Sequence, residues 1–209
     1  MICFFINFVT YEKQNCIMIE IEVKIVGISD LLKPSTSHAL ILEETYSYDS
    51  KRRLAIIIGD REAVDLRTCL MKYKTPRPLV HELTSKLLCE AEVTIDKAVI
   101  YNVSDGVYSS YIYGTNSSGK NFKVDARTTD ALALSLKMDF PVYITDELLE
   151  REQIHSVTPD GSGFSMPLNS VATDMLKLDM EAAIKNEDYE RAAILRDEIA
   201  RRKNEPECK

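Results

Sequence analysis

The sequence lacks the features that would place the protein in a membrane or in a disulfide-stabilised fold. No apolar run among its 209 residues approaches the ~20 residues that a transmembrane helix requires. Its five cysteines are an odd number, are widely scattered and form no CxxC pair, which favours free thiols in a reducing compartment. Residues 1–17 are apolar but show no basic segment and no small-residue cleavage site. We therefore expect a cytoplasmic protein that does not associate with membranes.

Motifs of several common enzyme classes are also absent. We find no glycine-rich phosphate loop, no dinucleotide-binding fingerprint and no serine-nucleophile motif. The pair His81–Glu82 is not followed by the second histidine of an HExxH zinc site. The formal net charge is −7, so the whole protein has no general attraction for nucleic acid or acidic membranes. Any phosphate binding must come from a local patch or from a metal ion.

The composition that is present is that of an ordinary globular protein, with 45% apolar and 28% charged residues. Short alternating or apolar runs predict strands, and two turn signals, "SDG" and "NSSG", join the last three of them into a meander. The predicted strands are "IEIEVKIVGIS", "SHALILEE", "RRLAIIIG", "DKAVIYNV", "GVYSSYIYG" and "NFKVDA". Helices are predicted at Arg61–Lys72, Pro78–Ala91, Thr129–Met138 and Asp146–Glu152.

The chain also contains a weak internal repeat. Shifting the sequence by 65 residues aligns "IIIGDREAVDLRTCLMKYKTPRPLVHEL" with "NFKVDARTTDALALSLKMDFPVYITDEL" without a gap. A slip of three residues instead matches Glu62–Ala63 with Asp130–Ala131, so the sequence leaves the register open. In either register we predict an α+β fold, built from a duplicated strand-rich unit with packed helices.

The C-terminal part has a different character. Residues 156–172 are rich in Gly, Ser and Pro and are interpreted as a linker that leaves the following segment mobile. Residues 173–204 have the pattern of an α-helical hairpin, with Asp188 capping its second helix. We therefore predict a main domain at 18–155, preceded by an extension at 1–17. Because Met18 opens the first clean strand, we expect translation to start there.

The hairpin is too small to be stable alone and should need a partner. Apolar residues recur on each of its helices, and packing the two helices together should not bury all of them. The residues expected to bind a partner are Leu176, Met180, Tyr189, Leu195 and Ile199.

The motif "DARTTDA" is the best candidate for chemistry. Asp125 and Arg127 come at the end of a strand, Thr128 or Thr129 can cap the next helix, and Asp130 lies in its first turn. Carboxylates there could hold a hard divalent cation, and the free amides of the helix favour anions. The structural alternative is a helix cap with an Arg–Asp pair that braces the two halves.

A second candidate is "PRPLVHEL". His81 and Glu82 are predicted on the exposed side of a helix whose Leu79, Leu83 and Leu87 point inward. His81 could act as a general base or as a metal ligand, with Glu82 beside it. A single histidine on a helix is more often a half-exposed residue without such a role.

A third candidate is the segment from Lys51 to Arg77, which carries eight basic and three acidic residues. Arg52, Arg53 and Arg77 are the residues expected to contact a phosphate backbone. Such a segment is more often the solvated side of a helix and its turns. Four tyrosines of the meander could stack bases, or could divide between core and surface: Tyr101, Tyr108, Tyr111 and Tyr113.

Taken in order, "IGDREAVDL", "TPRPLVHELTSKLL" and "DARTTDALALSLKMDFPVYITDELLE" resemble the bacterial bifunctional nuclease domain, a family credited with DNase and RNase activity. The resemblance covers about Met18–His155. The usual family form of the last motif begins D-A-R-P-S-D-A. Here Thr128 and Thr129 replace Pro-Ser, which removes a rigid proline before the helix, and Asp65 stands where alanine is common.

The tail, "LKLDMEAAIKNEDYERAAILRDEI", is similar to the UVR motif of excision-repair nuclease subunits and of some protease-associated adaptors. In that family the hairpin pairs antiparallel with another such hairpin. The resemblance therefore implies a protein-interaction module, whose partner is a second copy of the chain or another UVR-containing protein.

Two functions follow as expectations. The first is a nuclease that hydrolyses phosphodiester bonds of DNA or RNA, with Asp125, Asp130 and Glu62 near a divalent metal ion, Mg²⁺ or Mn²⁺. In it His81, with Glu82 beside it, transfers protons and Arg127 stabilises the phosphorane charge. The second is a non-catalytic binding or adaptor protein that recruits a partner through the hairpin.

Overall fold

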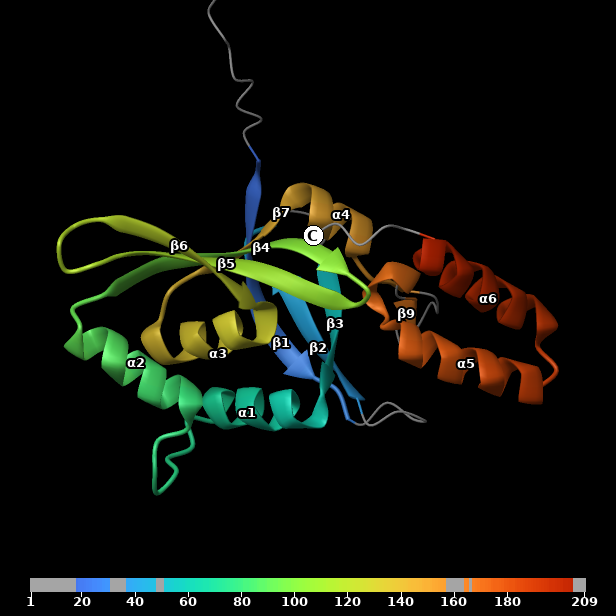
Figure 1. Ribbon diagram of the computed structural model, residues 1–209, viewed down its shortest axis with the longest axis horizontal. Coiled ribbons are helices and arrows are strands. Elements are labelled where there is room, and N and C mark those ends of the chain that lie inside the picture. Colours follow the sequence, from blue (N-terminus) through green and yellow to red (C-terminus); the bar gives the residue numbers. More distant parts are fainter. Residues whose placement is uncertain (1–17, 31–36, 48–50, 157–163, 166, 205–209) are drawn as a thin grey trace, which may run out of the picture.

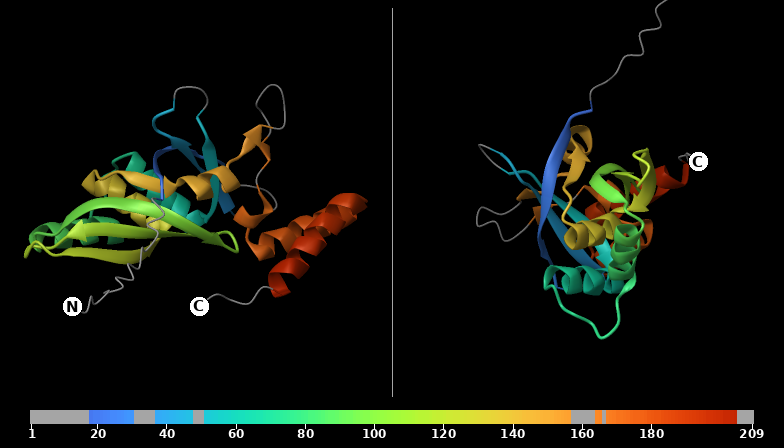
Figure 2. Two further views of the ribbon diagram at one scale, coloured as in Figure 1. Left: turned by 90° about the horizontal axis from the view of Figure 1, so that it is seen from above. Right: turned by 90° about the vertical axis from the view of Figure 1, so that its left-hand side faces the viewer.

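The computed structural model of the protein describes residues 18–30, 37–47, 51–156, 164–165 and 167–204. The predicted extension at 1–17 and the question of the start codon lie outside these residues. The described part is a mixed α+β domain followed by a helical hairpin, as the sequence predicts. Figures 1 and 2 show the hairpin beside the sheet, next to the turn between β4 and β5.

A seven-stranded sheet forms the centre of the domain, in the order β3-β2-β1-β7-β4-β5-β6. All described neighbours are antiparallel except β4 and β7, which are parallel. The predicted strands are confirmed, and β7 is an additional strand between the two halves of the sheet. The strands are β1 (Glu20–Ile28), β2 (Ser37–Glu44), β3 (Arg53–Gly59), β4 (Thr94–Ser104), β5 (Val107–Thr115), β6 (Asn121–Arg127) and β7 (Val142–Thr145).

Helices cover the sheet mainly from one side. In Figure 1, α1, α2 and α3 lie below the strands and α4 lies above them. The four helices expected from the sequence are confirmed to within two residues, as α1 (Asp60–Leu70), α2 (Val80–Glu90), α3 (Thr128–Met138) and α4 (Asp146–Glu152). No helix among the described residues is both long and apolar enough to span a bilayer.

The duplication predicted from the sequence is visible in the topology. Each half consists of three antiparallel strands followed by a helix, β1–β2–β3–α1 and β4–β5–β6–α3, and β7 pairs with the first strand of both halves. The helices start at Asp60 and Thr128, which are 68 residues apart. The structure therefore selects the register with the slip of three residues. In this register Glu62 and Asp130 occupy the same position, the third residue of each helix.

The side of α2 that faces the domain is opposite to the predicted one. Leu79, Leu83 and Leu87 were expected to point inward, but they are 40%, 48% and 60% exposed, and α2 has no buried residue. The side of α2 that carries His81 instead faces α3, where His81 contacts Asp130. The main core is formed without α2, by side chains of the strands and of α1, α3 and α4.

The hairpin consists of α5 (Thr173–Lys185) and α6 (Tyr189–Asn204). Asp188 accepts a hydrogen bond from the Arg191 amide at 3.1 Å, so it caps the second helix as predicted. Leu176, Leu195 and Ile199 pack into a small core that Leu168, Val171 and Met180 complete.

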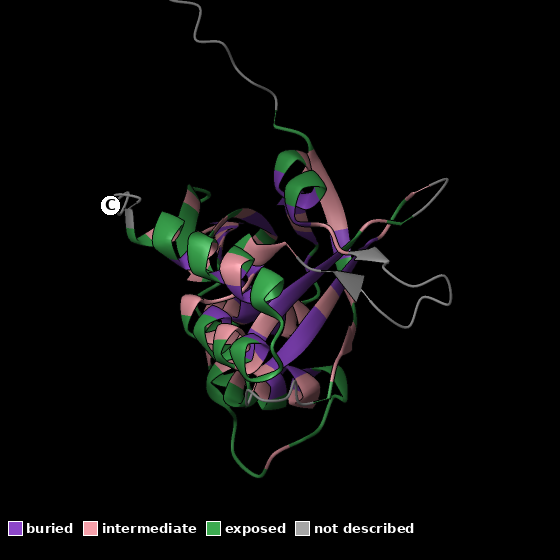
Figure 3. Ribbon diagram, turned by 90° about the vertical axis from the view of Figure 1, so that its right-hand side faces the viewer, coloured by how far each residue is buried: buried purple, intermediate pink, exposed green. Residues whose placement is uncertain are grey.

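This packing corrects the expected partner surface. Leu176, Leu195 and Ile199 are 1%, 3% and 7% exposed and are therefore not available to a partner, because the two helices and the preceding segment bury them together. Met180 is half-buried and Tyr189 is 67% exposed. The outer side of the hairpin is largely exposed in Figure 3. Its large apolar residues are Leu178, Ile184, Tyr189 and Ile194.

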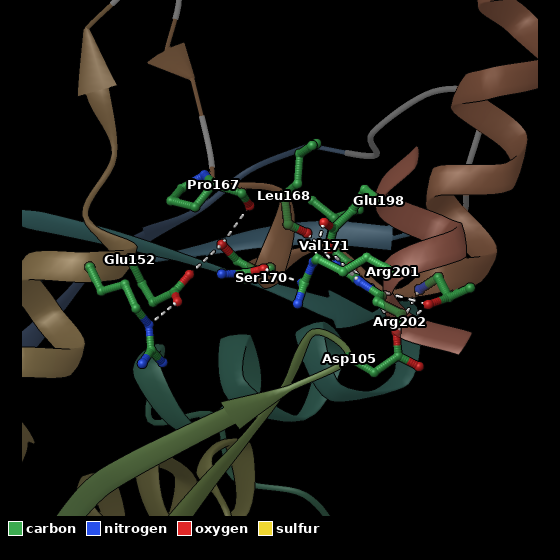
Figure 4. A network of polar contacts seen from close by, with 12 residues as sticks. Asp105, Glu152, Pro167, Leu168, Ser170, Val171, Glu198, Arg201 and Arg202 are labelled. Carbon is green, nitrogen blue, oxygen red and sulfur yellow. Dashed lines mark hydrogen bonds and ion pairs between the residues drawn. The ribbon is translucent and has the colours of Figure 1, made fainter. Parts of the chain in front are cut away.

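A polar network holds the base of the hairpin against the domain (Figure 4). Arg202, whose side chain is 12% exposed, donates to Asp105 in the β4–β5 turn at 2.7 Å and to the carbonyls of Val171 and Leu168. Thr173 donates to the same Asp105 oxygen through its amide and its hydroxyl. Burial would raise the pKa of Asp105, but these hydrogen bonds hold it below its ordinary value.

The C-terminal end of the predicted linker is therefore packed. Residues 157–163 and 166 lie outside the described part, and two short strands, β8 (His155–Ser156) and β9 (Phe164–Ser165), pair with each other. The turn η1 (Leu168–Ser170) contacts β3 and β4. Ser170 is fully buried and donates to Glu152, also fully buried, at 3.3 Å. The segment after residue 166 fastens the hairpin to the domain instead of serving as a free tether.

Substitutions at two turn glycines test whether the β4–β5 turn holds the hairpin against the domain. Gly106 and Gly119 have φ of +75° and +77°, but a Cβ on Gly106 would lie 2.6 Å from the Ala172 nitrogen, whereas one on Gly119 meets nothing within 4 Å. We expect Gly119→Ala to lower the free energy of unfolding by about 1 kcal/mol through backbone strain alone. Gly106→Ala should cost more and should speed proteolysis within residues 167–173. Urea denaturation measures both, and equal costs would show that the turn does not hold the hairpin.

Candidate active site

The first turns of three helices converge on one cavity of about 640 Å³. It is lined by residues of the α1 start, the α2 start and the α3 start, together with the end of β3. The ionisable residues of this lining are Asp60, Arg61, Glu62, Asp65, His81, Arg127 and Asp130. Because unpaired amides at a helix start carry a partial positive charge, the three starts add a positive contribution to the potential in the cavity, which opposes that of its carboxylates.

Four of the predicted site residues form a connected network in this cavity. Arg127 Nη1 lies 3.0 Å from Glu62 Oε1, and Arg127 Nε lies 3.3 Å from Asp130 Oδ2. The other oxygen of Asp130 lies 3.2 Å from His81 Nε2. The Arg127 side chain is 62% exposed, and that of His81 is 16% exposed. One guanidinium therefore joins the equivalent carboxylates of the two halves, and one of these also holds the imidazole.

The backbone at the start of α3 explains how Arg127 reaches the cavity. Arg127 is the N-cap residue, so the threonine cap expected from the sequence is not formed. The hydroxyl of Thr128 instead bonds Ser110 at 2.7 Å in a buried contact with β5, and that of Thr129 donates to Glu62 at 3.4 Å. Arg127 is still paired with Ser109 in the β5–β6 register, but it is the last residue of β6 and α3 starts at the next residue. Its side chain therefore lies beside the helix starts, where it contacts Glu62 and Asp130.

Asp125 is not part of the cavity. In the strand register it lies opposite Tyr111, and it accepts a hydrogen bond from the Tyr101 hydroxyl at 3.1 Å. The neighbours of Tyr111 on β5, Ser110 and Ile112, are buried on the α3 side. Successive residues of a strand point to opposite faces, so Asp125 lies on the face away from His81. The expectation that Asp125 lies with Asp130 and Glu62 near one metal ion is corrected in this respect.

Glu82 also lies outside the cavity lining. It forms an ion pair with Lys86, four residues later on α2, at 2.8 Å. The hydrogen bond from Lys86 holds the pKa of Glu82 below its ordinary value. The Glu82 side chain, which is 31% exposed, is thus held by Lys86 and not by the residues of the cavity.

The predicted phosphate-binding arginines are largely engaged with carboxylates. Arg52 contacts Glu44, Asp146 and Glu150 at 3.3, 2.9 and 3.2 Å. Arg53 lies opposite Glu43 in the β2–β3 register and contacts it at 2.8 Å. Arg77 is exposed in the loop before α2, apart from these two. The three arginines therefore do not make one basic patch. The count of charges within residues 51–77 suggested such a patch because it omitted the acidic residues of β2 and α4.

The charges that line the cavity favour a cation, but the positions of the side chains do not form a binding site for one. Its lining contains the carboxylates of Asp60, Glu62, Asp65 and Asp130 against the two arginines Arg61 and Arg127. Oxygen ligands of this kind suit Mg²⁺ or Mn²⁺. However, Arg127 already pairs with Glu62 and Asp130, and no group of three or more His, Cys, Asp or Glu in the described part of the chain is placed to hold a metal ion. In the arrangement described, these residues do not form a metal site.

Sequence reasoning missed a second histidine–carboxylate pair beside the cavity. His38 on β2 is 4% exposed, and its Nε2 lies 3.3 Å from Asp60 Oδ1. Its Nδ1 lies 2.9 Å from the Ser29 carbonyl, which also accepts from Arg67. The only available signal was a histidine in an otherwise apolar strand, and the partner is 22 residues away in sequence.

Comparison with known proteins identifies two families along the chain. Residues 40–157 match the model of the bifunctional nuclease domain, and residues 175–205 match the UvrB/uvrC motif. The uncharacterized proteins MT1877 and Rv1829, from two strains of Mycobacterium tuberculosis, are each 28% identical to this chain over 141 residues, which cover 68% of it and 80% of each relative. The candidate active site lies wholly within the matched domain. The chain therefore belongs to the bifunctional nuclease domain family and carries a C-terminal UvrB/uvrC motif.

Proposed function

We propose that the protein is a nuclease that hydrolyses phosphodiester bonds of DNA or RNA. The observation that supports this most is the network of His81, Asp130, Arg127 and Glu62 in a cavity at three helix starts, within the family domain. The network combines a proton-transfer group with an exposed cation for the phosphate. These are the two functions that phosphodiester hydrolysis demands of side chains.

The geometry suggests a role for each residue. Asp130 holds His81 through Nε2, which leaves Nδ1 to take a proton from the attacking water and lets the carboxylate stabilise the imidazolium. Arg127 is held through Nε and Nη1, so Nη2 can donate to a non-bridging phosphate oxygen. The water oxygen bonds to phosphorus, the bond to one ester oxygen breaks, and the proton that His81 took passes to that oxygen, which returns the imidazole to its neutral form. The products are a phosphomonoester end and a hydroxyl end.

Dependence on Mg²⁺ or Mn²⁺ remains a proposal drawn from the sequence and from the acidic lining. For an ion to bind Glu62 and Asp130 together, Arg127 must turn out of its place between them. Cation and guanidinium therefore compete for the same two carboxylates.

The alternative function is a non-catalytic binding or adaptor protein. One observation favours it, since the Arg127 ion pairs are also what a brace between the two halves requires. In that case the hairpin would be the functional part of the chain.

In either case, we propose that the hairpin binds a second UvrB/uvrC-type hairpin, in another copy of this chain or in another protein. The matched motif supports this, and so do four apolar residues that remain exposed on the hairpin after its own core is formed. They are Leu178, Ile184, Tyr189 and Ile194.

The nuclease proposal is tested with plasmid DNA and RNA, each with Mg²⁺, with Mn²⁺ and with a chelator. We expect His81→Gln and Arg127→Gln each to lower the cleavage rate by about 100-fold or more, because each removes a group that acts on the reacting phosphate. Glu82→Gln, on the same helix but outside the cavity, should change the rate little. Cleavage that survives both cavity substitutions points to a contaminant, and no cleavage by the wild-type protein favours the adaptor.

Competition between cation and guanidinium is tested by calorimetric titration with Mn²⁺. Replacing Arg127 by Leu frees two carboxylates, so the affinity for Mn²⁺ should rise at least about tenfold. Arg61→Leu is the matched control, because it removes one positive charge from the same lining. Equal affinities for both variants would mean that general charge matters and that Arg127 does not occupy the position of an ion.

Association through the hairpin is tested with two adjacent residues of α6. Ile194 is 60% exposed and Leu195 is 3% exposed. Ile194→Asp should reduce the molar mass found by light scattering while the melting temperature is kept, because it places a charge on the contact surface. Leu195→Asp should instead unfold the hairpin. An unchanged mass for Ile194→Asp, with no loss of a UvrB/uvrC-type partner, argues against this surface.

A further inference from the structure

Four tyrosines gather on the face of the sheet that α1, α2 and α3 do not cover. Tyr101 comes from β4, Tyr111 and Tyr113 from β5, and Tyr143 from β7. On β5 they alternate with Ser110 and Ile112, which are buried on the α3 side. Tyr108, which the sequence grouped with them, is 3% exposed and faces the core. All four are half-buried, and in Figure 1 no helix of the described chain lies above β6 and the part of β5 beside it.

Three of the rings contact one another, and the Lys97 ammonium lies within reach of both Tyr113 and Tyr143. Tyr101 and Tyr111 are stacked, with centroids 4.0 Å apart and planes 9° from parallel, and Tyr113 meets Tyr111 edge-on at 6.4 Å. Val99 lies opposite Tyr111 on one side and Tyr143 on the other, and it is only 4% exposed. The tyrosines therefore lie over the strands and cover them.

Two lysines lie on these rings. The Lys123 ammonium is 3.3 Å from the Tyr111 centroid, and that of Lys97 is 5.3 Å from Tyr113 and 5.7 Å from Tyr143. Beside them, Lys97, Tyr113 and Tyr143 line a second cavity of about 310 Å³. Aromatic faces with lysines within reach are the pairing that binds nucleobases together with their phosphates.

The charges on this face favour single-stranded over double-stranded nucleic acid. Lys97 is paired with Glu20 at 2.5 Å, and Asp125 lies beside Tyr101, so the local charges nearly cancel. A neutral surface gives little attraction for the paired backbone of a duplex, whose bases are already stacked on one another. Unpaired bases, in contrast, can leave their neighbours and stack on tyrosine rings.

We propose that this tyrosine face binds single-stranded nucleic acid, with bases stacked on Tyr111, Tyr113 and Tyr143. Lys97 and Lys123 then move from the rings to the phosphates. The inference rests on the proposed function and extends it, because the face leads to the cavity. Asp125 and Arg127 are two residues apart on β6, which is about 7 Å along a strand. A single strand on the tyrosines thus passes the end of β6 to reach Arg127.

The test measures binding of the full chain to a fluorescein-labelled, phosphorothioate-linked 12-nucleotide thymidine oligomer by anisotropy. Tyr113→Phe keeps the ring and should keep the affinity, whereas Tyr113→Leu should weaken binding about tenfold, the loss typical of one base–aromatic stack. Tyr111→Leu combined with Tyr113→Leu should weaken it further. The protein has ten tyrosines and no tryptophan, so stacking should also quench its tyrosine fluorescence. Circular dichroism checks that each variant is folded.

The outcomes separate this inference from the nuclease proposal. If the bases of the oligomer stack on the tyrosines but unmodified nucleic acid is not cleaved, the result supports the tyrosine face as a binding site and contradicts the nuclease proposal. If nucleic acid is cleaved while the Phe and Leu variants bind equally well, the tyrosine face is not the binding site. Equal affinity for a duplex of the same length also overturns the proposal. So does a change of molar mass in the Leu variants without a change in binding, since it would assign the face to a second copy.

Discussion

The ion pairs of Arg127 are the contact on which the arrangement of the site depends. Duplication places a carboxylate at the third position of two helices, Glu62 on α1 and Asp130 on α3, and both helices start at the same cavity. Two carboxylates facing one cavity repel each other unless a cation lies between them. Arg127 supplies that cation from the residue before α3, at 3.0 and 3.3 Å. His81 depends on the same contact, because the carboxylate that holds it is the one that Arg127 positions.

Much of the fold could be predicted from the sequence, because most of its elements carry a periodic signal. The strand β2 was predicted with its exact bounds, and α4 likewise. The strand β7 was missed although it joins the two halves, because a strand of four residues, three of them buried, is too short to show a clear alternation. The register of the repeat was open for a related reason. Sequence matches at 65 and at 68 residues are similar, and only the helix starts decide between them.

The candidate site could be predicted in composition but not in geometry. Asp125 and Arg127 have the same parity on β6, so alternation alone places them on one face. They separate because Arg127 is the last residue of β6 and directly precedes α3, so that its side chain contacts carboxylates at the helix starts, whereas Asp125 contacts Tyr101. Likewise, the apolar spacing of α2 identified a helix but not the side that faces the domain. Leu83 and Leu87 point outward because the contact with α3 is made through His81. The pairing of Arg52 and Arg53 with carboxylates of β2 and α4 is a tertiary property that a local count of charges omits.

The cavity and the tyrosine face differ in how they attract nucleic acid. Its lining has more carboxylates than arginines, so by itself it attracts a phosphate backbone only weakly, in spite of the helix starts. A nuclease built on this cavity must therefore obtain affinity elsewhere. The tyrosine face offers affinity of another kind, since stacking needs no net charge and works for any base. Because the face and the cavity lie at two sides of the same strand, β6, binding and chemistry can be separated on this fold. An overall charge of −7 is then compatible with a nucleic-acid substrate.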